Sequence, residues 1–192
     1  MPGNFRKEDL RIIKTYRALL SSMLMLLEQR NFAKITTNDI CEDALISRST
    51  FYCHFRDKYD LLRYWLSSLE TELTQDAHEQ ENFFNSINGL ISNNSKKITN
   101  LLQGADGEIL DLMLSFMYDI MDSAFDDKGD SGTNNIIFSS FCSGGLLNLL
   151  LWQVQNKFPM DSQFMNPYLY GLLENIWNWN SNQEAIDGGY SI

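Results

Sequence analysis

Apolar residues recur at helical spacing along nearly the whole chain, and little of it alternates like a half-buried strand. Proline is scarce, with only Pro2, Pro159 and Pro167 to interrupt helices. We therefore predict an all-α protein. The expected helices cover 8–30, 37–44, 48–54, 81–102, 107–125, 135–157 and 162–179, together with one that Asp57 caps and that runs to about residue 78.

Two segments lack this periodicity. Residues 126–134 are rich in Asp, Gly and Ser, which predicts a loop, and residues 180–192 read as a polar tail. The chain length fits one compact unit or two small ones. We place an N-terminal domain at 1–66 and a larger helical domain at 67–192.

The segment after the first long helix has the pattern of two short helices joined by a tight turn. Thr36 can cap the first of them, and Asp39 three residues later makes a near capping box. Ser47 can cap the second, whose inner stripe is formed by Phe51 and Phe55. This layout is that of a helix-turn-helix, in which the second helix enters the major groove of DNA.

The outer face of the second helix carries side chains suited to reading DNA. Arg48, Ser49 and Thr50 lie in its first turn, the end that reaches base edges. An arginine can bind guanine through two hydrogen bonds, and a hydroxyl can meet either kind of base. Tyr52 and His54 project outward and can reach phosphate.

Lys58 follows Asp57 in the first turn of the next helix, an unfavourable place for a cation in the field of the helix dipole. Its position makes sense if the partner is an external phosphate, which helix amide ends also attract. The full set of DNA contacts that we predict is Thr36, Thr37, Arg48, Ser49, Thr50, Tyr52, His54 and Lys58.

The spacing of residues 36–62 resembles the signature of TetR-type repressors. The matching residues are Thr36, Ile40, Ala44, Ser47, Thr50, Phe51, Tyr52, His54, Phe55, Lys58, Leu61 and Leu62. The resemblance implies that Thr36, Thr50, Tyr52 and Lys58 occupy positions that commonly touch DNA.

The chain departs from that signature at three positions. Leu45 stands where the family usually has glycine in the turn, and a left-handed backbone there would cost roughly 1–2 kcal/mol. Ser49 replaces another common glycine and adds a side chain at the DNA surface. Cys41 replaces a usual alanine and reads as a small core residue.

Beyond residue 66 the resemblance is one of layout, and it implies a larger domain that binds a small effector and dimerises through its last two long helices. Small residues four apart let another helix approach closely. The alternative is that these small residues let a helix of the same chain pack closely. The interface residues that we predict are Ser140, Gly144, Leu147, Leu172 and Ile176.

A segment rich in methionine and aromatic residues is our candidate wall for the effector site. Such side chains adapt to irregular apolar ligands, although a plain helix core is the simpler interpretation of each. The predicted ligand-binding residues are Met113, Phe116, Met117 and Met121.

The net charge of −10 is unevenly distributed along the chain. Residues 1–66 hold 11 Lys and Arg against 8 Asp and Glu, whereas the remaining 126 residues hold 4 against 17. This asymmetry favours a phosphate-facing N-terminal part joined to a part with another task.

These features predict a homodimeric, ligand-responsive repressor that binds a near-palindromic operator in double-stranded DNA. The alternative is a regulator of the same fold that acts as an adaptor through a partner protein. We expect no enzyme, metal site or cofactor, because no catalytic set or metal spacing occurs. We expect a cytoplasmic location, without membrane association, because no secretory signal and no apolar run of about 18 residues is found.

Overall fold

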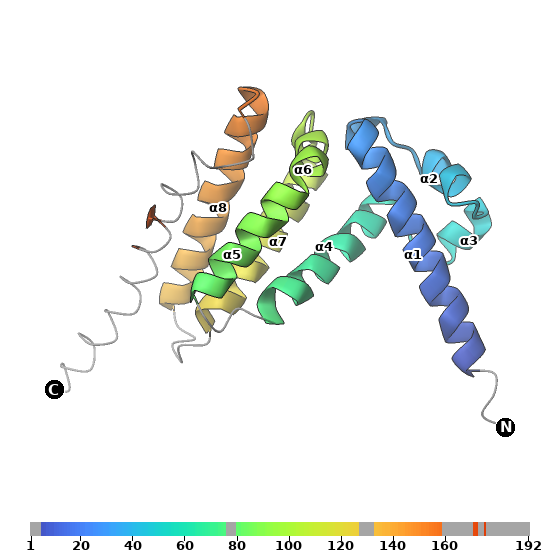
Figure 1. Cartoon of the computed structure of the whole chain (residues 1–192), viewed down its shortest axis with the longest axis horizontal. Helices are drawn as coiled ribbons and strands as arrows, with labels where there is room; N and C mark the ends of the chain where they lie inside the picture. Colours follow the sequence, from blue (N-terminus) through green and yellow to red (C-terminus); the bar gives the residue numbers. More distant parts are fainter. Residues whose placement is uncertain (1–4, 76–79, 127–132, 159–170, 173–174, 176–192) are drawn as a thin grey trace. The chain divides into compact units, whose positions relative to one another are not determined.

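The computed structural model describes residues 5–75, 80–126, 133–158, 171–172 and 175. All regular elements in these ranges are helical, which confirms the all-α prediction (Figure 1). They are α1 (Phe5–Gln29), η1 (Phe32–Lys34), α2 (Thr37–Asp43), α3 (Arg48–Tyr52), α4 (Lys58–Gln75), α5 (Gln80–Asn93), α6 (Ser95–Leu102), α7 (Gly107–Asp126) and α8 (Thr133–Gln155).

One predicted helix is divided in the structure. The single helix expected over 81–102 is in fact two, α5 and α6, which meet at Asn94. The Asn94 side chain donates a hydrogen bond to the Leu90 carbonyl at 3.0 Å, so it competes locally with the regular helix. The other helices begin and end near the expected residues. The expected helix over 162–179 and the tail over 180–192 lie outside the described residues, apart from Gly171, Leu172 and Asn175.

The described residues divide into two compact units, one within 1–68 and 96–112 and one within 69–95 and 113–192. In the first unit the fully buried side chains come from α1, η1, α2, α3, α4, α6 and α7. They are Leu19, Met23, Leu27, Phe32, Ile35, Ile40, Phe51, Leu61, Leu62, Leu101 and Ile109. Polar contacts tie α6 to the end of α1, since Asn100 donates to the Leu27 carbonyl at 2.8 Å and Lys97 pairs with Glu28 at 2.8 Å.

In the second unit, α7 and α8 each bury one face. The buried face of α8 carries Cys142, Leu146, Leu147 and Leu150, together with three buried polar side chains, Ser139, Ser143 and Gln153. The Ser143 hydroxyl donates to the Ser140 carbonyl at 3.1 Å, which satisfies it inside the helix. Burial raises the pKa of the Cys142 thiol to about 11, so this thiol is an uncharged part of the core.

α8 also qualifies as a membrane span by length and composition, over Ile136–Gln155. The expectation that no segment reaches that length and apolarity was therefore wrong. In the structure 44% of the qualifying window is buried inside the protein. A core helix passes the same test, and the packing of Leu146 and Leu150 places α8 in the core of the second unit.

Candidate nucleic-acid interface

The first short helix, α2, begins with two reciprocal hydrogen bonds. The Asp39 amide donates to the Thr36 hydroxyl at 3.2 Å, and the Thr36 amide donates to the Asp39 carboxylate at 2.8 Å. This is a complete capping box, as the sequence predicted. Arg30 adds an ion pair to Asp39 at 3.0 Å. The hydrogen bonds from Thr36 lower the pKa of Asp39, and Arg30 contributes in the same direction.

The turn after α2 ends the helix through a left-handed residue. Leu45 has φ 55°, and its amide donates to the Glu42 carbonyl at 3.2 Å. The next amide, of Ile46, donates to the Cys41 carbonyl at 3.0 Å. This pair of bonds is the Schellman motif, whose left-handed position favours glycine. The strain that the sequence predicted at Leu45 is therefore present, and the side chain is 93% exposed.

We expect Leu45→Gly to raise the free energy of unfolding by about 1 kcal/mol, because it removes left-handed strain and gives up almost no packing. Urea unfolding of the full chain measures the change. Leu45→Ala is the matched control, since it removes the exposed side chain but keeps the β-carbon that causes the strain. Equal stability of the glycine and alanine variants would contradict the assignment.

The second short helix, α3, is capped by Ser47. The Thr50 amide donates to the Ser47 hydroxyl at 3.1 Å, and that oxygen lies 2.9 Å from the Ser49 hydroxyl and 2.8 Å from the Thr50 hydroxyl. Phe51 is fully buried and Phe55 nearly so, which confirms the predicted inner stripe. The opposite face of α3 is thus turned to solvent by the packing of its two phenylalanines.

Four predicted contacts come together on that outer face. Arg48, Ser49 and Tyr52 are exposed and Thr50 is half-buried, with the Arg48 guanidinium 6.0 Å from the centre of the Tyr52 ring. His54 behaves differently, because it is half-buried and its ring meets Tyr16 of α1 edge-on at 5.2 Å.

Lys58 opens α4 as predicted, but its ammonium is bound within the first unit. Its Nζ donates to the carbonyls of Phe32 at 2.9 Å and Ile35 at 2.8 Å, and lies 4.6 Å from the centre of the Phe32 ring. Burial lowers the pKa of Lys58, while Asp106, Asp39 and Asp57 act in the opposite direction. These carbonyls account for a cation at a helix start without an external phosphate. The phosphate contact stays a prediction that depends on the third N–H of the ammonium.

We expect Lys58→Met to lower the free energy of unfolding by about 1.5–3 kcal/mol, because two hydrogen bonds from a charged donor are lost. The Ile35 carbonyl then loses its ammonium partner, whereas the Phe32 carbonyl keeps its bond from the Ile35 amide. Thermal unfolding monitored by circular dichroism measures this. Lys14→Met, at an exposed lysine of α1, serves as the control and should change stability little. Comparable stability of the two variants would show that the carbonyl contacts of Lys58 are not stabilising.

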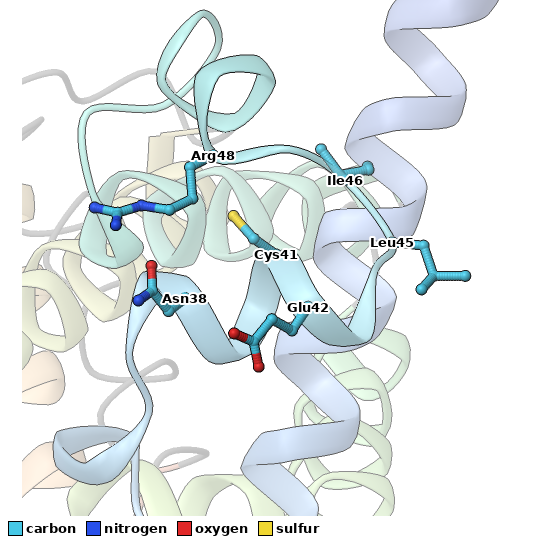
Figure 2. Close-up of a pocket in the computed structure, with 6 residues that line it drawn as sticks. All are labelled: Asn38, Cys41, Glu42, Leu45, Ile46 and Arg48. Atoms are coloured by element: carbon cyan, nitrogen blue, oxygen red, sulfur yellow. The ribbon is translucent and has the colours of Figure 1, made fainter.

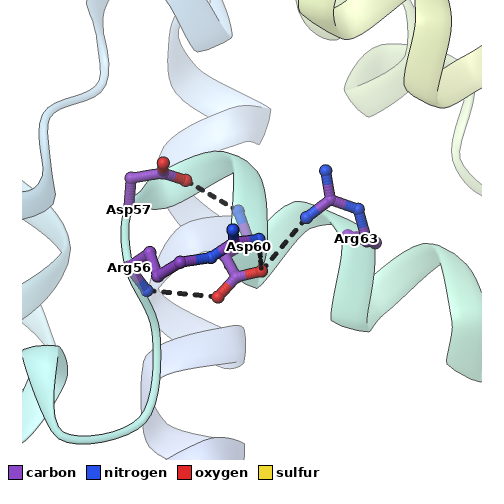
Figure 3. A network of polar contacts seen from close by, with 4 residues as sticks. All are labelled: Arg56, Asp57, Asp60 and Arg63. Carbon is purple, nitrogen blue, oxygen red and sulfur yellow. Dashed lines mark hydrogen bonds and ion pairs between the residues drawn. The ribbon is translucent and has the colours of Figure 1, made fainter.

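A charged network fixes the entry into α4 (Figure 3). Asp57 caps the helix, as predicted, by accepting a hydrogen bond from the Asp60 amide at 2.9 Å. Asp60 in turn pairs with Arg56 and Arg63, each at 3.1 Å. The hydrogen bonds from Arg56 lower the pKa of Asp60. The chain between α3 and α4 is thereby held close to the helix that follows it.

A further contact within the first unit joins the starts of α4 and α7. The Tyr59 hydroxyl donates to the Asp106 carboxylate at 2.6 Å, and Asp106 also accepts the Ile109 amide at 3.0 Å, which caps α7. The bond to Asp106 raises the pKa of Tyr59 to about 12 and lowers that of Asp106. Both groups are therefore in the form that sustains the bond at neutral pH.

The residues predicted for the effector site and those predicted for the interface differ in burial. Met113, Phe116, Met117 and Met121 are all buried on one face of α7, each with no more than 7% of its surface exposed. Of the predicted interface residues, Ser140 and Leu172 are exposed, Gly144 is half-buried, Leu147 is buried within the second unit, and Ile176 lies outside the described residues. The part of the chain that the structure describes contains no group of three His, Cys, Asp or Glu side chains suited to a metal ion.

Two features were not predicted from the sequence. A hollow of about 320 Å³ lies on the helix-turn-helix (Figure 2), lined by Asn38, Cys41, Glu42, Leu45, Ile46 and Arg48. The second is an exposed apolar face of α8, on which Ile137, Phe141 and Trp152 are between 48% and 68% exposed. These three residues share one face of a helix, which the sequence could have indicated. The face was missed because the buried side of α8 is apolar as well.

Residues 19–64 match the family model described as "Bacterial regulatory proteins, tetR family". The helix-turn-helix of this chain is therefore of the TetR type. This family is one of transcription regulators and not of enzymes, and its helix-turn-helix domain implies DNA binding. A Bacillus subtilis (strain 168) relative, described as the uncharacterized HTH-type transcriptional regulator YxbF, is 39% identical to this chain over 67 residues. That match covers 33% of this chain and 18% of the relative, so it spans less than a fifth of the relative's length.

Solved structures share the fold of this chain along most of its length. A TetR regulator from Streptococcus agalactiae 2603V is 22% identical with a TM-score of 0.62, covering 92% of this chain and 99% of its own. The dihydroxyacetone kinase operon activator DhaS is 16% identical with a TM-score of 0.62, covering 84% and 94%. NalD of Pseudomonas aeruginosa is 17% identical with a TM-score of 0.53, covering 86% and 96%. At these identities the likeness shows the fold alone.

Proposed function

We propose that this chain is a cytoplasmic, ligand-responsive repressor that binds a near-palindromic DNA operator as a homodimer. The observation that carries the proposal is the exposed polar face of α3, where Arg48, Ser49 and Tyr52 project from a helix fixed by its cap and by two buried phenylalanines. A rigid helix that presents such donors fits the major groove. The excess of basic residues in 1–66 supports the same assignment.

The exposed apolar face of α8 supports the homodimer. Ile137, Phe141 and Trp152 follow one another along the helix, and Gly144 and Gly145 lie between them. An added β-carbon at either glycine would meet nothing within 4 Å in one protomer, so neither glycine is required by the packing around it. A second copy of the same helix could pack closely against this face, because the two glycines leave room for it. The two helix-turn-helix motifs of the dimer would then bind successive major grooves about 34–36 Å apart.

For the effector, the proposal rests on the methionine-rich face of α7. The two helix-turn-helix motifs of a dimer can lie at different distances from each other. An apolar small molecule that binds the conformation with one distance better than another would shift the protein between DNA-bound and free forms. The close burial of Met113, Phe116, Met117 and Met121 also favours the second candidate, an adaptor that responds to a partner protein. The two candidates share the DNA-binding step. They differ in whether a small molecule or a partner protein binds the second unit.

Proteins with this fold are described both as an operon activator and as the secondary repressor of an efflux pump, so the fold carries DNA binding and not the sign of regulation. Selection from a pool of randomised duplexes with the full chain tests the DNA-binding step. We expect enrichment of one near-palindromic sequence. A pool that stays random after repeated rounds would contradict the proposal.

A further inference from the structure

The hollow lined by residues of α2, the turn and the start of α3 includes a side chain that no predicted DNA contact uses (Figure 2). We propose that Asn38 reads an A·T base pair beside the pair that Arg48 reads, with the base edges seated in this hollow. The inference rests on the proposed DNA-binding function. It gives the first helix of the motif a share in selecting the operator sequence.

The amide of Asn38 is available for this task. Asn38 is exposed in the first turn of α2, and its side chain makes no hydrogen bond to any other described residue. Figure 2 shows the Asn38 amide and the Arg48 guanidinium turned to the same side of the hollow. An asparagine amide matches the N6 and N7 atoms of adenine, and a guanidinium matches guanine, so the two side chains suit two different base pairs.

The charges around the hollow favour a base edge over a phosphate group. Arg48 and Glu42 border it with opposite charges, so a phosphate would be attracted by one and repelled by the other. A base edge presents both donors and acceptors and meets no such conflict. Cys41 is 3% exposed and burial raises its pKa, so it offers an uncharged wall, and Ile46 adds an apolar one. Such walls suit the methyl group of thymine in an A·T pair.

Local contacts hold the backbone at Asn38 and Arg48 in place before DNA arrives. The capping box of Thr36 and Asp39 fixes the start of α2, and the ion pair of Asp39 with Arg30 ties it to the end of α1. The Ser47 cap fixes the turn of α3 that carries Arg48. The two side chains therefore start from a backbone that needs little reorganisation on binding.

The test uses the full chain and the operator enriched from the randomised pool, with each base pair of one half-site replaced in turn. We expect Asn38→Ala to lose the preference for one A·T pair, reducing discrimination there about 5- to 150-fold. Arg48→Ala should lose the preference at a neighbouring pair instead. Alanine favours helix at position 38, so α2 should be retained. Asn93→Ala, at an exposed asparagine of α5, is the control and should leave the profile unchanged.

An Asn38→Ala profile that equals the unmodified one at every position would overturn the inference. So would a uniform loss of affinity for all sequences, because that is the behaviour of a phosphate contact. If the unmodified chain enriches no sequence, the proposed function itself fails, and the inference fails with it. That outcome is seen before any variant is measured, so the two failures are distinguishable.

Discussion

Replacing Arg48 with alanine is expected to weaken binding to the preferred operator by about 1–3 kcal/mol while changing binding to scrambled duplex little. Arg48 is exposed in the first turn of α3 and forms no ion pair with any described residue. Its guanidinium lies 6.0 Å from the centre of the Tyr52 ring. The guanidinium is therefore available to a guanine edge, and its loss should leave the fold intact.

Binding isotherms on operator and scrambled duplex, at two salt concentrations, measure this effect. Arg17→Ala, at an exposed arginine of α1, is the matched control because it removes the same charge away from α3. Thr50→Val should resemble Arg48→Ala more mildly, since one hydroxyl is lost and a methyl contact is kept. Equal weakening of operator and scrambled duplex by Arg48→Ala would show that its contact is to phosphate, and the assignment of the reading face would be wrong.

Replacing Phe141 with glutamate is expected to convert the proposed homodimer to a monomer at micromolar concentration. Phe141 is 68% exposed on one protomer, between Ile137 and Trp152 on the same face of α8. A carboxylate buried there between two copies would lack a partner and would face its own symmetry mate. Because two half-sites are then no longer held together, operator affinity should fall at least about a hundredfold.

Light scattering and operator titration follow the two consequences. Leu114→Glu places the same charge at another exposed apolar position, 41% exposed on α7, and should leave a dimer. Gly144→Trp tests the same surface through bulk instead of charge, and it fills open space in a single protomer. A Phe141→Glu variant that remains dimeric would place the interface elsewhere.

The local features of the helix-turn-helix could be predicted because they depend on residues close in sequence. The caps at Thr36, Ser47 and Asp57 each join groups three residues apart. The left-handed turn could be predicted because Leu45 stands where the TetR signature usually has glycine. The break between α5 and α6 was missed, because an asparagine side chain bonding its own helix leaves the apolar periodicity nearly unchanged.

Features that depend on distant residues could not be predicted in the same way. The carbonyls that bind Lys58 lie 23 and 26 residues earlier, so only the fold reveals them. In α8 almost every side is apolar or small, so the sequence does not distinguish the inner face from the outer one. Leu147 was assigned to the interface and lies inside the second unit, whereas Phe141, which was not assigned, is exposed. Asn38 was passed over because its relation to Arg48 depends on how the turn folds.

Hydroxyl-radical footprinting of the full chain on the enriched operator tests most directly whether α2 and α3 of a dimer read DNA. We expect two protected patches on one face of the duplex, centred about one helical turn apart. Each patch should be lost in Phe141→Glu at concentrations where the unmodified chain protects both. Uniform cleavage along the duplex, or protection unaffected by both Phe141→Glu and Arg48→Ala, would contradict this expectation.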